Sequence, residues 1–120
     1  MSIITLILAG IVALEHLYIM YLETLATQSD TTSRVFNVHK EELARPSVSS
    51  LFKNQGIYNG LIAVFLLYGI FTNSQLLVTV FVLNVFFAAI YGAITANKKI
   101  ILTQGGPAIL TLLSLIISLF

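Results

Sequence analysis

The stretch Ile3–Leu25, IITLILAGIVALEHLYIMYLETL, decides the fold class of this chain. A helix needs roughly 20 apolar residues to cross the hydrocarbon core of a bilayer, and this stretch is long enough. Glu15 and His16 interrupt it near its middle, and Glu23 lies near its end. An ionisable group at mid-bilayer depth costs roughly 3 kcal/mol, so it persists where it has a partner, lines a wet cavity or does chemistry. The stretch therefore predicts a membrane span with a polar site.

The composition extends this prediction to the whole chain. Of the 120 residues, 58% are hydrophobic and only 9% are charged, whereas soluble domains carry about 25% charged residues. Too little polar surface is present to cover a soluble core. The first stretch also lacks the basic leading segment of a signal peptide and is longer than its apolar core, so we expect a retained span. We therefore expect a multi-pass protein of the cell membrane, with the lipid bilayer as its partner.

Several classes of function are excluded by residues that are missing or scarce. Six lysines and arginines and a net charge of +1 do not form the basic patch that nucleic-acid binding requires. The chain has no cysteine, which excludes disulfides and thiolate chemistry. It has no glycine-rich nucleotide motif and no H-E-x-x-H, and its two histidines, His16 and His39, lie in different environments. We expect no cofactor and no metal site.

Four apolar blocks predict an all-α, four-helix membrane bundle that forms one domain over residues 1–120. The predicted spans are 3–25, 54–72, 75–96 and 99–120. The apolar part of the second block is short, but a helix can extend backward from it to Pro46. Proline suits the first position of a helix, because its missing N–H would be unpaired there.

The basic residues predict the orientation of these spans. Every lysine and arginine lies in the connection 27–53 or in the turn Asn97-Lys98-Lys99. With four spans these two connections face the same side, which the positive-inside rule assigns to the cytoplasm. Both termini and the uncharged turn Asn73-Ser74-Gln75 are then extracytoplasmic.

Polar residues in all four blocks form the predicted ligand-binding set, and we expect them to face a common interior. Asn84 is the one that we least expect to face lipid. For each residue the alternative is a hydrogen bond that holds helices together, worth roughly 1 kcal/mol. The set comprises Glu15, His16, Tyr18, Glu23, Gln55, Tyr58, Asn59, Asn84, Tyr91 and Gln104.

Glycines mark two further features of the spans. Gly56 and Gly60 form a G-x-x-x-G, which permits another helix to approach closely. Gly105 and Gly106 precede Pro107, and proline frees the carbonyl four residues earlier. Three interpretations of this segment stay open: a broken helix that opens a site, a plain kink, or a helix that starts at Pro107.

The chain resembles a family of small bacterial integral membrane proteins, domain-of-unknown-function family thirteen-oh-four. The resemblance implies four membrane spans and no assigned activity. It rests on segments in all four blocks: Glu15–Glu23, Asn54–Gly60, Ile90–Ala93 and Gln104–Ala108.

Three functions are compatible with these residues. The first is binding or transport of a small molecule or ion centred on Glu15 and His16, with a proton competing for the glutamate. The second is a membrane-embedded enzyme that acts on a lipophilic substrate, and the residues leave open whether the chain is an enzyme. The third is a structural or assembly subunit without its own ligand, and the glycine stripes would suit a homo-oligomer. We favour the first, because hydrogen bonds that only hold helices together would not require polar residues in every span.

Overall fold

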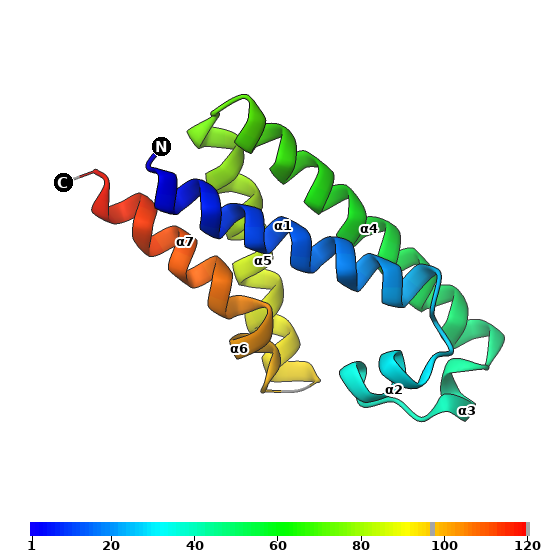
Figure 1. Cartoon of the computed structure of the whole chain (residues 1–120). Helices are drawn as coiled ribbons and strands as arrows, with labels where there is room; N and C mark the ends of the chain where they lie inside the picture. Colours follow the sequence, from blue (N-terminus) through cyan, green and yellow to red (C-terminus); the bar gives the residue numbers. More distant parts are fainter. Residues whose placement is uncertain (97, 120) are drawn as a thin grey trace. The chain divides into compact units, whose positions relative to one another are not determined.

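The computed structural model describes residues 1–96 and 98–119, and over these residues it contains helices and no strand. This confirms the all-α prediction. Asn97 of the predicted basic turn and Phe120 of the last predicted span lie outside the described residues. The helices, labelled in Figure 1, are α1 (Ile3–Thr24), α2 (Asp30–Phe36), α3 (Lys40–Leu43), α4 (Pro46–Phe71), α5 (Gln75–Thr95), α6 (Ile100–Thr103) and α7 (Gly105–Ile117).

Three of the helices in this part of the chain, α1, α4 and α5, are long and apolar enough to cross a membrane. Helix α4 begins at Pro46, ahead of the predicted bound of 54, because the chain enters the helix at the proline as its sequence favours. Within the predicted fourth span 99–120, the structure has the four-residue α6 and the 13-residue α7 instead of one helix.

The chain forms two compact units, each described separately. Unit 1 contains Met1–Glu15 and Ala63–Phe120, and unit 2 contains His16–Ile62.

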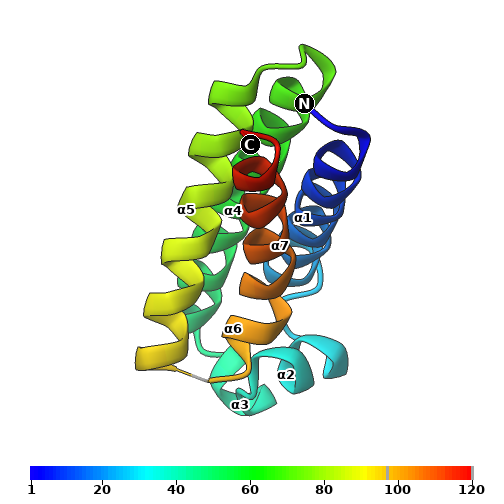
Figure 2. The ribbon, with the colours of Figure 1, turned by 90° about the vertical axis from the view of Figure 1, so that its left-hand side faces the viewer.

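Helices α5 and α7 pack together in unit 1 and run alongside each other in Figures 1 and 2. The buried residues of α5 are Val78, Val82, Val85 and Ala89, which recur every three or four positions and so form one helical face. The first turn of α1 is tied to α7 by the hydroxyls of Thr5 and Ser114, 2.7 Å apart. The beginning of α1 and the end of α7 therefore lie side by side.

The hairpin between α4 and α5, also in unit 1, follows the predicted uncharged turn. Asn73 has φ 52°, in the left-handed region that asparagine tolerates better than most residues. The hydroxyl of Ser74 then caps α5 by accepting a hydrogen bond from the backbone N–H of Leu77 at 3.3 Å. A close approach at Gly69, where an added Cβ would lie 3.0 Å from the Leu77 side chain, brings the two helices together.

In unit 2 the connection between α1 and α4 holds the short helices α2 and α3. Ser29 caps α2 by accepting from the backbone N–H of Thr32 at 3.1 Å, and the Thr32 hydroxyl donates to the Ala26 carbonyl at 2.7 Å. An exposed ion pair, with 2.9 Å between Lys40 Nζ and Asp30 Oδ1, joins the two helices. The hydrogen bond and the charge of Lys40 lower the pKa of Asp30, and the same contact raises the pKa of Lys40.

Candidate functional site

Glu23 and Asn59 form a polar contact between α1 and α4 within unit 2. Glu23 lies in the last turn of α1 and is only 6% exposed. The amide Nδ2 of Asn59, on α4, donates a hydrogen bond to Oε1 of Glu23 over 2.6 Å. Two members of the predicted set, 36 residues apart in the sequence, are thus in direct contact. A short bond to a carboxylate is of the stronger, charge-assisted kind when the carboxylate is ionised.

Glycines on α4 allow this contact to form. A Cβ added at Gly56 would lie 2.8 Å from Cγ2 of Thr24 and 3.1 Å from Cβ of Glu23, too close for any side chain. A Cβ added at Gly60 would overlap the end of the Met20 side chain. Both glycines face the last turns of α1. The close crossing predicted from the G-x-x-x-G is confirmed, and it brings Asn59 within reach of Glu23.

Glu15 and His16 are adjacent in sequence but belong to different units. In unit 1, Oε1 of Glu15 is buried and accepts no hydrogen bond from the described residues. In unit 2, His16 is 3% exposed. His16 is thus buried, whereas Glu15 is half-buried. Their ligand-binding role stays a prediction.

Other members of the predicted set lie at the surface of the chain. Tyr18, Tyr58 and Tyr91 are 51%, 64% and 70% exposed, and Gln55 and Asn84 are also exposed. These five side chains do not share a buried interior with the pair formed by Glu23 and Asn59.

The exposure of Asn84 differs from the expectation that it would avoid lipid. Its neighbour Val82 belongs to the buried face of α5, and a residue two positions further along a helix is turned by about 200°. Asn84 is also turned by about 100° from Val85, so it lies outside the buried face of α5.

Gln104 marks a break between two helices. Helix α6 ends at Thr103, Gln104 is half-buried, and α7 begins at Gly105. Pro107 is thus the third residue of α7, within the first turn, where a missing N–H leaves no helical bond unmade. The Thr111 hydroxyl donates to the Pro107 carbonyl at 2.8 Å. Of the three open interpretations, the structure shows a broken helix that restarts two residues before Pro107.

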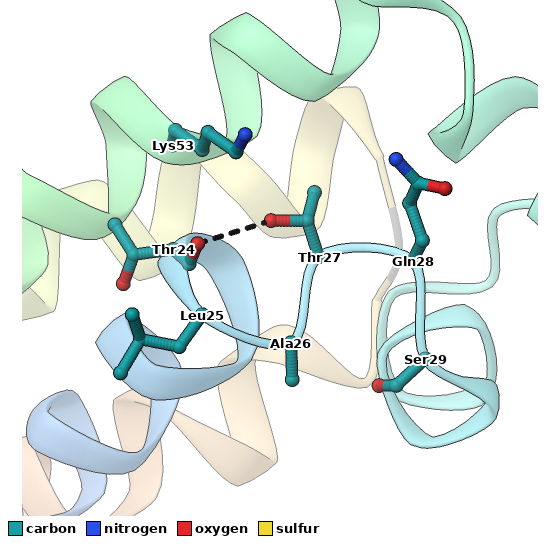
Figure 3. A pocket seen from close by; sticks show the side chains of 7 residues that line it. All are labelled: Thr24, Leu25, Ala26, Thr27, Gln28, Ser29 and Lys53. Carbon is teal, nitrogen blue, oxygen red and sulfur yellow. Dashed lines mark hydrogen bonds between the residues drawn. The ribbon is translucent and has the colours of Figure 1, made fainter.

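Two cavities in unit 2 lie outside the predicted set. The first has a volume of about 360 Å³ and is lined by Lys53 and by the segment from Thr24 to Ser29 (Figure 3). The second has a volume of about 480 Å³, shares Gln28 and Lys53 with the first, and adds Ala44, Pro46, Ser49, Ser50 and Asn54. Sequence reasoning missed both, because they depend on how the connection 27–45 folds back on α4. The available signal was Lys53, a cation in the polar first part of a helix that is long and apolar enough to cross a membrane. The described residues contain no group of three histidines or acidic residues that could hold a metal ion.

Two of three comparisons with known proteins gave matches. The family profile described as "Protein of unknown function (DUF1304)" matches residues 10–116. The "Uncharacterized protein YpaA" of Lactococcus lactis subsp. lactis (strain IL1403) is 61% identical over 116 residues, which cover 95% of this chain and 98% of that protein. No solved structure gives a significant match. The chain therefore belongs to the DUF1304 family of proteins of unknown function.

Proposed function

We propose that the chain is a four-span membrane protein that binds a small ammonium-bearing molecule at Glu23 and Asn59 and moves it across the bilayer. The observation that carries the proposal is the hydrogen bond between Asn59 and the 6%-exposed Glu23, at the end of an apolar helix. An ionisable group inside a membrane span marks a functional site by default.

The charge balance around Glu23 favours a cationic ligand. Among the described residues, ion pairs join Lys40 to Asp30 and Arg45 to Glu42, and neither Glu15 nor Glu23 has such a partner. An ionised carboxylate removed from water is costly unless a cation or proton accompanies it. Glu23 therefore supplies a negative charge that a ligand can neutralise.

The atoms left over at this contact fit an ammonium group. Asn59 Nδ2 donates its hydrogen bond to Oε1 of Glu23. The other oxygens of the two side chains, Oε2 of Glu23 and Oδ1 of Asn59, remain as acceptors for a ligand. An ammonium group has N–H donors and no acceptor, so it can use both oxygens. A proton on Glu23 would remove the negative charge, so binding should weaken as the pH falls.

Movement across the membrane is supported by a second acidic residue on α1. Glu15 precedes Glu23 by eight residues, about 12 Å of helical rise. Its buried Oε1 accepts no hydrogen bond from the described residues, so it is free to receive the ligand or a proton at a different depth.

The proposed four-helix bundle uses α6 and α7 together as the fourth span. Helix α7 alone would rise about 20 Å, less than the roughly 30 Å of hydrocarbon. Adding α6 and the break at Gln104 lengthens this segment. Four spans place all lysines and arginines on the cytoplasmic side and both termini outside.

The orientation is testable with single cysteines, because the natural chain has none. We expect Glu41→Cys and Lys98→Cys to react with a membrane-impermeant maleimide only after the cells are permeabilised. Gln75→Cys, at the first residue of α5, should react in intact cells. All three positions are exposed. Labelling of Lys98→Cys and Gln75→Cys from the same side would contradict the four-span arrangement.

Uptake of radiolabelled methylammonium into proteoliposomes tests the function. We expect uptake that is saturable, that weakens as the external pH falls, and that is lost in Glu23→Gln, which keeps the size of the side chain and an acceptor for Asn59. Glu42→Gln, at an exposed glutamate, is the matched control and should take up methylammonium normally. A Glu23→Gln protein that is folded and transports like the natural chain would overturn the proposal. A Glu23→Gln protein that no longer folds would favour the structural role.

A further inference from the structure

The two cavities of unit 2 adjoin at Gln28 and Lys53, which line both. They lie where α1 ends and α4 begins, at the junction between apolar helices and the charged connection. Figure 3 shows Lys53 on α4 and Gln28 on the connection flanking the space above Thr27. The cavities are separate from the contact between Glu23 and Asn59, because neither residue lines them.

Polar groups dominate the walls, and several of them are uncommitted. The Thr27 hydroxyl donates to the Glu23 carbonyl at 2.7 Å, and the Ser29 hydroxyl caps α2. By contrast, the side chains of Gln28, Ser49, Lys53 and Asn54 have no hydrogen-bond partner among the described residues. As a whole residue, Ser49 is 8% exposed. The cavities therefore offer an ammonium, two amides and a hydroxyl to a ligand.

The charge of the lining selects an anion. Lys53 contributes a positive charge, and no aspartate or glutamate lines either cavity. Of the three acidic residues in the connection, Asp30 is paired with Lys40 at 2.9 Å and Glu42 with Arg45 at 3.1 Å, and Glu41 lines neither cavity. Lys53 itself has no acidic partner in the described part of the chain.

We propose that these cavities bind a phosphate group, with Lys53 as the charged ligand and Gln28, Ser49 and Asn54 as neutral donors. Lysine binds phosphate as a point charge, and hydrogen bonds to an ionised group are about twice as strong as those between neutral groups. The position at the end of two candidate spans is where the phosphate of a lipid headgroup would lie. A free phosphate compound could reach the same donors from the aqueous side. The shared chemistry is the phosphate.

Titration of the purified full chain in a neutral detergent, followed by native mass spectrometry, tests this proposal. The probes are inorganic phosphate, dihexanoyl-phosphatidylglycerol and dihexanoylglycerol, which lacks the phosphate. We expect Lys53→Gln to weaken binding of a phosphate-bearing probe by about tenfold, equivalent to 1.4 kcal/mol, and Lys53→Arg to retain most of it. Lys98→Gln removes an exposed lysine outside the cavities and should change the dissociation constant less than twofold.

The probes distinguish the two sources of phosphate. Lysine-dependent binding of phosphatidylglycerol alone identifies a lipid headgroup site, and lysine-dependent binding of inorganic phosphate identifies a site for a soluble compound. The proposal is overturned if neither phosphate probe binds, if Lys53→Gln binds like the natural chain, or if dihexanoylglycerol binds as tightly as phosphatidylglycerol. Circular dichroism verifies that each variant is folded. Gln28→Ala, at an exposed cavity residue, should also weaken binding.

This inference stands independently of the proposed ammonium site. Glu23→Gln should leave phosphate binding unchanged, and Lys53→Gln should leave methylammonium uptake saturable and dependent on pH. Either proposal can therefore fail without the other.

Discussion

Replacing Gly56 with leucine is expected to destabilise unit 2 by about 3 kcal/mol, the upper end of the usual range for overpacking. Even a single Cβ at this position would lie 2.8 Å from Cγ2 of Thr24 and 3.2 Å from the Thr24 backbone nitrogen. A backbone atom cannot rotate away as the end of a side chain can. The ends of α1 and α4 must separate, and Asn59 then loses its bond to Glu23.

Gly10 provides the matched control for this substitution. It lies in α1, which like α4 is long and apolar enough to cross a membrane, but a Cβ added there would meet nothing within 4 Å. Gly10→Leu should therefore unfold at nearly the same denaturant concentration as the natural chain. The denaturant concentration at which Gly60→Ala unfolds should lie between those of the two leucine variants, because its added Cβ meets only the flexible side chain of Met20. Circular dichroism during titration with sodium dodecyl sulfate gives the comparison, and equal losses for Gly56→Leu and Gly10→Leu would show that the close crossing does not exist.

Replacing Asn59 with leucine is expected to destabilise the chain by about 1–3 kcal/mol, because Glu23 would remain buried without its donor. The substitution removes the 2.6 Å bond to Glu23, a residue that is only 6% exposed in the natural chain. Asn54→Leu, one and a half turns earlier on α4, changes an exposed side chain and should have a much smaller effect.

The double substitution Glu23→Leu/Asn59→Leu separates the effect of losing the hydrogen bond on stability from the effect of changing the size of the side chains. Replacing both partners of a buried hydrogen bond with apolar groups can be nearly neutral. We therefore expect the double variant to be more stable than Asn59→Leu alone, in the same denaturant titration. Strictly additive losses would mean that the two side chains do not interact.

The sequence predicted the helices well because their signal is long and strong. The blocks 3–25 and 75–96 became α1 and α5, each ending one residue earlier than predicted, and Pro46 marked the beginning of α4. The fourth block was less predictable. Pro107 with two glycines signalled an irregularity, but the position of the break depends on packing against α5, which no local pattern contains.

The candidate site was only partly predictable, for a physical reason. In a soluble helix the apolar face identifies the buried side, whereas a membrane helix is apolar on all faces and its packing depends on small residues and shape. Asn59 was brought to Glu23 by Gly56 and Gly60, and that glycine pair was visible in the sequence. The rotation of α5 was set by Val78, Val82, Val85 and Ala89, and it turned Asn84 outward.

Equilibrium binding of methylammonium to the purified protein shows whether the Glu23 carboxylate, hydrogen-bonded to Asn59, is the ligand-binding group. Binding should be measured at two pH values for the natural chain, Glu23→Gln and Glu42→Gln. We expect the natural chain and Glu42→Gln to bind methylammonium saturably, and more weakly at the lower pH. We expect a folded Glu23→Gln protein not to bind it. Equal binding by folded Glu23→Gln and the natural chain at both pH values would contradict this expectation.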